Sequence, residues 1–123
     1  MILTITGQIP SGKNQHQLLW CKGKVVKYPN QRFKDWRKDA ARQVCMQAGY
    51  DREAHMTPVS LRCEYWPGDH RTRDVSGMLD AIFYLLVYCE LLHDDGLIYD
   101  VVWKRMAVSK FPKVCLEIGA WKP

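Results

Sequence analysis

The most informative part of this chain is residues 69–100, DHRTRDVSGMLDAIFYLLVYCELLHDDGLIYD. Carboxylates stand at both ends of a run rich in Leu, Ile, Val, Phe and Tyr: Asp74 and Asp80 lie near its start, and Asp94 and Asp95 lie at its far end. Ionised carboxylates rarely stand beside an apolar element in a water-soluble protein unless they are paired or bind a cation. The stretch therefore predicts a buried helix whose flanking carboxylates have such a partner.

The helix is expected over residues 76–92, and it is apolar nearly all round. Such a helix is either enclosed by its own domain or shared with a second subunit, so a homodimer is one expectation. Its longest uninterrupted apolar run, residues 81–89, is about half of the ~20 residues that a membrane span requires. The chain opens with apolar residues and without a basic leader. We therefore expect a cytoplasmic protein that does not associate with membranes.

Periodicity along the rest of the chain predicts several strands and one further helix. That helix is expected from an Asn30 cap to residue 48, with Gly49 as a left-handed stop. Its apolar stripe at helical spacing consists of Phe33, Trp36, Ala40 and Val44. Strands are expected over residues 1–8, 59–66, 96–108 and 114–121, and a hairpin over 18–28 with its turn at 22–24. This order predicts a single α+β domain over residues 1–123, in which a mixed β-sheet packs against two main helices.

Basic and acidic residues are unevenly distributed in this chain of 123 residues, whose net charge is +5. Residues 1–50 hold nine Lys and Arg against two aspartates, a charge of +7, which leaves −2 for the remainder. A basic half joined to an acidic half suits a protein that binds a polyanion with one part and a metal ion with the other. The simpler interpretation is that the lysines only make the surface soluble.

Residue spacing argues against several common kinds of site. Five cysteines form an odd set without a CxxC pair, which disfavours a disulfide framework and a structural zinc site, and Cys63 and Cys115 are expected to pack in the interior. Residues 7–14 match a phosphate-binding P-loop except at the last position, where Asn14 replaces the Ser or Thr that reaches Mg²⁺. We therefore expect no nucleotide cofactor. The four histidines show no ligand-like spacing.

The carboxylates remain as the candidate site. Hydrolysis with two metal ions uses several carboxylates around ions roughly 4 Å apart, which align a water with a phosphate. Mg²⁺ prefers oxygen ligands and keeps several waters. Asp74 and Asp80 stand where the helix is expected to begin. The alternative is structural: Asp74 and Ser76 cap the helix, and residues 94–96 are a turn sequence in their own right.

The separation of the carboxylates along the expected helix limits which of them can bind the same ion. A straight helix from Asp80 to Asp95 is about 22 Å long at roughly 1.5 Å per residue, which one ion cannot bridge. Either the chain folds back after about Tyr88, or the second carboxylate comes from another subunit across a two-fold axis. In the second case, antiparallel pairing of two such helices completes a pair of sites.

These residues resemble the RusA family of Holliday junction resolvases, small homodimeric endonucleases of bacteria and their phages. The resemblance covers most of the chain. It rests on the loop of residues 10–14, on the basic first helix and above all on Arg73 and Asp74 followed by LHDD at residues 92–95. The family's central motif is Asp-x-Asp-Asn followed by a lysine on the helix, with an Asp-Asp pair after it. The interval from Asp74 to Asp95 fits that motif without a gap.

Carried over position by position, Asp74 matches the first catalytic aspartate of the family and Asp95 the last, with Asp94 as its partner. The second catalytic aspartate falls on Ser76, and the helix lysine falls on Asp80, which reverses its charge. We interpret these departures as linked: Asp80, one turn beyond Ser76, would restore the lost carboxylate at the same metal. The role of the lost lysine would then pass to another basic residue, namely Lys13, Arg71, Arg73 or a lysine of the first helix.

The resemblance implies a homodimeric, Mg²⁺-dependent endonuclease, with Mn²⁺ as a substitute ion, that resolves four-way DNA junctions by paired phosphodiester hydrolysis. The implied catalytic residues are Asp74, Asp80 and Asp95, with Asp94 as a further metal ligand. The implied phosphate contacts are Lys13, Lys34, Lys38, Arg71 and Arg73. Two alternatives stay open: a branched-DNA-binding dimer of the same fold that does not cut, and an adaptor that binds other proteins through its apolar helix.

Overall fold

A mixed β-sheet is the centre of the fold. The computed structural model describes residues 1–10, 16–21, 23–29, 31–49 and 52–123, with the backbone alone for 16–21 and 25–29. Within these ranges the strands of the main sheet are β1 (Ile2–Thr6), β4 (Val59–Trp66), β5 (Ile98–Arg105) and β6 (Lys113–Ala120). Their order is β1-β6-β4-β5; β6 runs antiparallel to both neighbours, and β4 and β5 are parallel.

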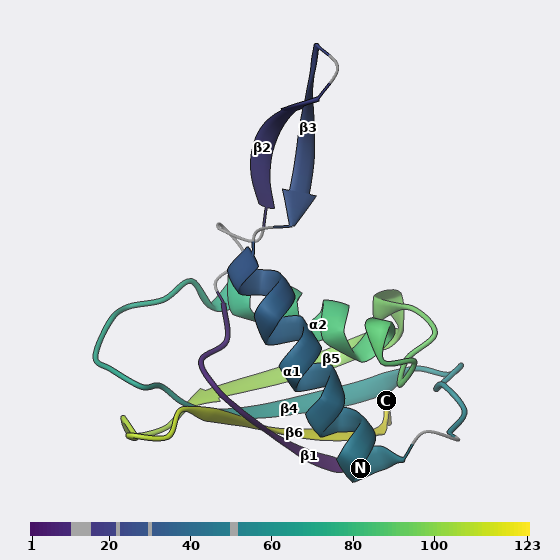
Figure 1. Ribbon diagram of the computed structural model, residues 1–123. Helices are drawn as coiled ribbons and strands as arrows, with labels where there is room; N and C mark the ends of the chain where they lie inside the picture. Colours follow the sequence, from purple (N-terminus) through teal and green to yellow (C-terminus); the bar gives the residue numbers. More distant parts are fainter. Residues whose placement is uncertain (11–15, 22, 30, 50–51) are drawn as a thin grey trace.

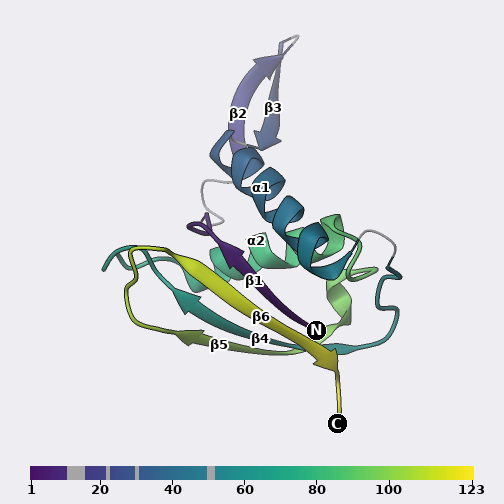
Figure 2. The same ribbon diagram turned by 60° about the horizontal axis from the view of Figure 1, so that its bottom comes forward.

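The helices lie together on one face of this sheet. They are α1 (Gln31–Ala48) and α2 (Val75–Tyr88), shown above the strands in Figure 1. Figure 2 turns the opposite face of the sheet forward, and no helix of the described chain covers it. The predicted α+β class and the predicted order of elements are confirmed. No described helix combines the length and the apolar character that crossing a membrane requires.

Alternation along β4 decides which side chains enter the core. Val59, Leu61, Cys63 and Tyr65 are buried beneath the helices, whereas the residues between them face the open side of the sheet. The stripe predicted for α1 supplies all four buried residues of that helix. Burial raises the pKa of the Cys63 thiol to about 12, in keeping with its predicted place in the interior. Cys115 is only half-buried.

A separate two-stranded sheet forms the predicted hairpin. It consists of β2 (His16–Cys21) and β3 (Lys24–Pro29), paired antiparallel, and Figure 1 shows it projecting away from the main sheet. Gly23 in the turn has φ 76°, which glycine adopts without strain. Gly49 ends α1 at φ 84°, which confirms the predicted left-handed stop. The predicted Asn30 cap lies outside the described residues.

The prediction of a second helix over residues 76–92 is wrong at its end. Helix α2 ends at Tyr88 because Glu90 adopts a left-handed conformation, with φ 58°. The N–H groups of Glu90 and Leu91 donate hydrogen bonds of 3.0 and 2.9 Å to the carbonyls of Val87 and Leu86. This is the Schellman arrangement, which most often uses glycine. The strand after it, β5, is likewise shorter than the predicted 96–108.

Two glutamines of α1 cover the outer edge of β1. Gln43 Oε1 accepts from the Thr6 N–H at 2.8 Å, and its amide nitrogen donates to the Thr6 carbonyl at 3.1 Å. Gln47 forms the same pair of bonds with Thr4, at 2.8 and 2.6 Å. The two glutamines lie one helical turn apart on α1, and the two threonines lie two residues apart on β1 and point to the same side. The two spacings match, so each glutamine lies opposite one threonine. The side-chain amides thus bind the backbone N–H and C=O groups of an edge strand that would otherwise be open to another strand.

Candidate metal site

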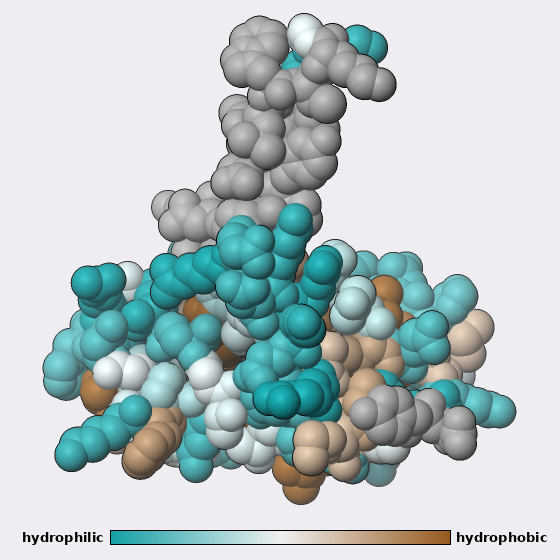
Figure 3. Space-filling view, viewed as in Figure 1, coloured by the Kyte–Doolittle hydropathy of each residue, from teal (hydrophilic) through white to brown (hydrophobic). Residues whose placement is uncertain are grey.

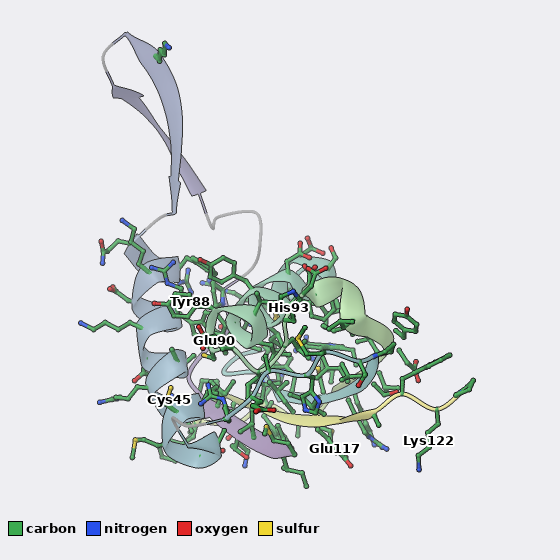
Figure 4. The ribbon with its side chains drawn as sticks, turned by 90° about the vertical axis from the view of Figure 1, so that its right-hand side faces the viewer. Cys45, Tyr88, Glu90, His93, Glu117 and Lys122 are labelled. Carbon is green, nitrogen blue, oxygen red and sulfur yellow. The ribbon has the colours of Figure 1, made fainter. Side chains whose placement is uncertain are left out.

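The chain folds back after α2 and brings the second group of carboxylates toward the first. Beyond the turn at Glu90, the chain pairs with the loop before β4: the His93 N–H donates to the His55 carbonyl at 3.0 Å, and the His55 N–H donates to the Leu91 carbonyl at 2.9 Å. Figure 4 shows Tyr88, Glu90 and His93 following one another around this turn. Of the two routes that the sequence left open, the structure follows the one within a single chain.

Three of the four predicted carboxylates line one open pocket of about 360 Å³. Asp80 reaches it from α2, and Asp94 and Asp95 reach it from the segment that leads through the short 3₁₀ helix η2 (Asp95–Leu97) into β5. Its remaining lining residues are Phe83, Tyr84 and Val87 of α2. All three aspartates are exposed. Within the described ranges, none of their carboxylates accepts a hydrogen bond or forms an ion pair.

Gly96 leaves space for one of these carboxylates, a role that the sequence did not reveal. A Cβ at this position would lie 3.0 Å from Oδ2 of Asp94. Contacts this short force the neighbouring atom to move. The glycine directly after the Asp-Asp pair therefore contributes to the shape of the site, although the sequence had suggested only a turn there.

The donor set fits Mg²⁺ held in an open site and does not fit a closed protein cage. No three His, Cys, Asp or Glu side chains in the described part of the chain lie close enough together to hold an ion. Mg²⁺ needs fewer protein ligands, because it keeps several waters and is usually bound by one or two carboxylates together with substrate phosphates. Carboxylate oxygens that have no partner in the described part of the chain, on an exposed pocket, meet that requirement.

Asp74 is not among the described residues that line this pocket. It occupies the N-cap position of α2, and its Oδ1 accepts a hydrogen bond of 2.9 Å from the Ser76 hydroxyl. Asp80 lies about 9 Å further along the helix axis, at roughly 1.5 Å per residue. The arrangement thus groups Asp80 with the Asp94–Asp95 pair, whereas the sequence predicted that Asp80 and Asp74 share one ion.

The basic residues before α2 are partly engaged within the protein. Arg73 forms a bidentate ion pair with Asp69, with N–O distances of 2.7 and 3.0 Å. The hydrogen bonds from the Arg73 side chain and from the Arg71 N–H lower the pKa of Asp69 to about 2. A phosphate would have to compete with Asp69 for Arg73, whereas the side chain of Arg71 is exposed.

The first helix carries two of the five predicted phosphate contacts. Lys38 is exposed and Lys34 is half-buried on α1, and Figure 3 shows a hydrophilic surface along this helix. Acidic residues share that surface: Asp39 pairs with Arg42 at 2.7 Å. The predicted contact of Lys13 lies outside the described residues.

An arginine and two tyrosines join α1 to the pocket, and sequence reasoning missed them. The Arg37 guanidinium lies 5.0 Å from the ring centre of Tyr88 and donates to the Tyr84 hydroxyl at 3.1 Å. The two tyrosine rings are stacked, 6.0 Å apart and inclined by 17°. Because Tyr84 also lines the pocket, this group joins a cation of α1 to one of the residues that line it. The spacing of Tyr84 and Tyr88 along one helix face was the available signal.

Comparison with protein-family models gave no matching family, and no curated protein sequence matched the chain. The residues and geometry of this chain are therefore the basis for inferring its function. Among the described residues, the chain provides an open pocket with carboxylates that have no partner, lined by a helix that contacts the basic helix α1.

Proposed function

We propose that this protein is a Mg²⁺-dependent endonuclease that cuts branched DNA, with four-way junctions as substrate and Mn²⁺ as a substitute ion. The observation that carries the proposal is that Asp80, Asp94 and Asp95 line one open pocket although they come from separate segments. The resemblance of residues 69–100 to RusA-type resolvases supports the same conclusion and adds a homodimer, in which paired sites would nick opposing strands.

The residues of the pocket divide the chemistry between them. Bound Mg²⁺ would lower the pKa of a water and offset the charge that develops on the phosphate. Asp94 and Asp95 would hold the ion with one or both carboxylates, and Asp80, across the pocket, would orient the attacking water. Arg37, which donates to the hydroxyl of the pocket-lining Tyr84, would bind a phosphate of the same strand. Lys34, Lys38 and Arg71 would contact flanking phosphates, so binding would weaken steeply with salt.

Cleavage of a synthetic four-way junction tests this proposal. We expect cutting with Mg²⁺, no cutting with EDTA, and a loss on the order of 100-fold for Asp80→Asn and Asp95→Asn with junction binding retained. The matched control is Asp35→Asn, which changes an exposed aspartate of α1 that does not line the pocket. Cutting by the pocket variants at the native rate would show that the pocket is not the active site.

The same assay assigns a role to Asp74. If its carboxylate only holds Ser76 at the start of α2, Asp74→Asn should cut within a few-fold of the native rate. If Asp74 binds an ion with DNA present, as the family motif implies, the loss should equal that of Asp95→Asn.

A branched-DNA-binding protein that does not cut is the second candidate. It is favoured by Ser76 at a catalytic position of the family motif, and by the absence, in the described ranges, of three metal-binding side chains gathered at one point. This candidate predicts junction binding without cleavage in either Mg²⁺ or Mn²⁺.

A further inference from the structure

The two outer edges of the main sheet differ in a way that points to a partner. The edge of β1 is covered by the amides of Gln43 and Gln47. The opposite edge is β5, which pairs only with β4 among the described strands and lies at the rim of the sheet in Figure 2. An edge strand without cover offers its N–H and C=O groups to another strand.

The side chains of β5 also suit a second strand. Tyr99 and Val102 are 58% and 49% exposed, and Val101 and Trp103 are half-buried. The register with β4 places Asp100, Val102 and Lys104 on the open face of the sheet, opposite Ser60, Arg62 and Glu64. Asp100 and Lys104 are both exposed, carry opposite charges and stand symmetrically about Val102. The strand is therefore complementary in charge to an inverted copy of itself.

We propose that β5 pairs antiparallel with β5 of a second copy of this chain, about a two-fold axis that passes through Val102. In this register Asp100 faces the partner subunit's Lys104, and Lys104 faces the partner's Asp100, so two opposite-charge pairs form. Val102 faces its own copy, and Val101 faces the partner's Trp103 on the helix side of the sheet. The interface is isologous, as a two-fold dimer requires.

Other registers do not pair these charges. In a two-fold antiparallel arrangement, the register can shift only in steps that keep side chains of one face of the sheet opposite side chains of the same face. The neighbouring registers place Asp100 or Lys104 opposite Val102, and the next ones place Asp100 opposite itself or Lys104 opposite itself. A parallel arrangement in register also sets like charges against each other, which is unfavourable. Charge complementarity thus selects one register.

This dimer would place both copies of the proposed active site on one side of the joined sheet, an inference that rests on the proposed function. A two-fold axis perpendicular to the sheet keeps α1 and α2 of both copies on the same side. Each pocket includes Asp95, shortly before β5, and the two copies of Ile98 would lie about 26 Å apart along the strand direction at roughly 3.3 Å per residue. Both carboxylate pockets would then face one side of a continuous sheet, where a single branched DNA can reach them.

A charge-exchange experiment tests the interface independently of DNA and metal. We expect the native chain to sediment as a dimer, and Asp100→Lys and Lys104→Asp each to associate at least about 10-fold more weakly, because each variant opposes like charges twice. An equimolar mixture of the two variants should recover dimers that contain one copy of each, as should the double variant Asp100→Lys/Lys104→Asp alone. Matched controls are Glu53→Lys and Lys110→Asp, which change exposed charges outside β5.

Several outcomes would overturn the proposal. A native chain that stays monomeric at high concentration contradicts it, as do variants that dimerise as tightly as the native chain, which would place the interface elsewhere. If a charge variant fails to fold, Val102→Arg, which sets two like charges on the axis, replaces it and must dissociate the dimer. Junction cleavage is measured separately, so a failure of this interface and a failure of the nuclease proposal remain distinguishable.

Discussion

The turn at Glu90 returns the chain toward Asp80, and replacement of Glu90 by glycine should stabilise the protein. The left-handed conformation, φ 58° at Glu90, costs an L-residue roughly 1–2 kcal/mol. Glycine removes that cost but adds about 0.4–1 kcal/mol of conformational entropy to the unfolded chain. The exposed Glu90 side chain forms no hydrogen bond or ion pair with the described residues, so little else is lost. We expect a net gain of about 0.5–1 kcal/mol, or a rise in Tm of about 2–5 °C.

Urea unfolding, with a thermal scan as a second measurement, checks this prediction. The matched comparison is Gly49→Ala at the end of α1, where φ is 84° and a Cβ would meet no atom of the described residues within 4 Å. Because the two variants differ from the native chain only in how well the residue tolerates a left-handed backbone, alanine should lower the free energy of unfolding by about the amount that Glu90→Gly adds. A destabilised Glu90→Gly protein, or an unaffected Gly49→Ala protein, would show that the left-handed backbone does not carry this conformational cost.

Three further predictions concern acid stability, the covered edge and the pocket. The hydrogen bonds with Arg73 lower the pKa of Asp69 to about 2. The ion pair therefore stabilises the fold fully at pH values above the ordinary carboxyl pKa of 3.8, and this stabilisation is lost as the pH falls toward 2. Asp69→Asn should therefore flatten the loss of stability between about pH 4 and pH 2, measured by urea unfolding, and an unchanged slope contradicts this. Gln47→Ala should speed hydrogen exchange at the Thr4 amide and leave the central strands protected; unchanged exchange at Thr4 would count against the edge cover. Gly96→Ala should displace the adjacent carboxylate and reduce Mg²⁺-dependent cleavage by about 10-fold with DNA binding intact, whereas native cleavage would exclude a role for Gly96.

Helix α1 was predictable because local signals agree along its whole length. Its apolar stripe recurs at helical spacing, and Gly49 provides a stop that few other residues tolerate. The end of α2 was not predictable in this way. Apolar residues continue through Leu92, and the left-handed turn is made by a glutamate, so neither hydrophobicity nor residue type marks the boundary.

The candidate site, too, could be predicted from the sequence only in part. The sequence identified the aspartates as candidates, but spacing alone could not decide whether Asp80 meets Asp94 and Asp95 within one chain or across a dimer. The turn after Tyr88 decides this, because it shortens the helix and reverses the chain. The contact of Arg37 with the tyrosines of α2 joins distant segments, so only the packing of one helix against another reveals it.

The proposed function requires that the pocket lined by Asp80, Asp94 and Asp95 binds a divalent ion. Titration of Mn²⁺ into ¹⁵N-labelled protein, followed by paramagnetic broadening of the amide signals, tests it without DNA. We expect broadening to begin at these three residues and to be weakened by Asp80→Asn and Asp95→Asn, while the amides of Asp35 and Asp39 on α1 respond only at higher Mn²⁺ concentration. Broadening that starts on α1, or that spreads evenly over all exposed carboxylates, would show that the pocket is not a specific site for a divalent ion.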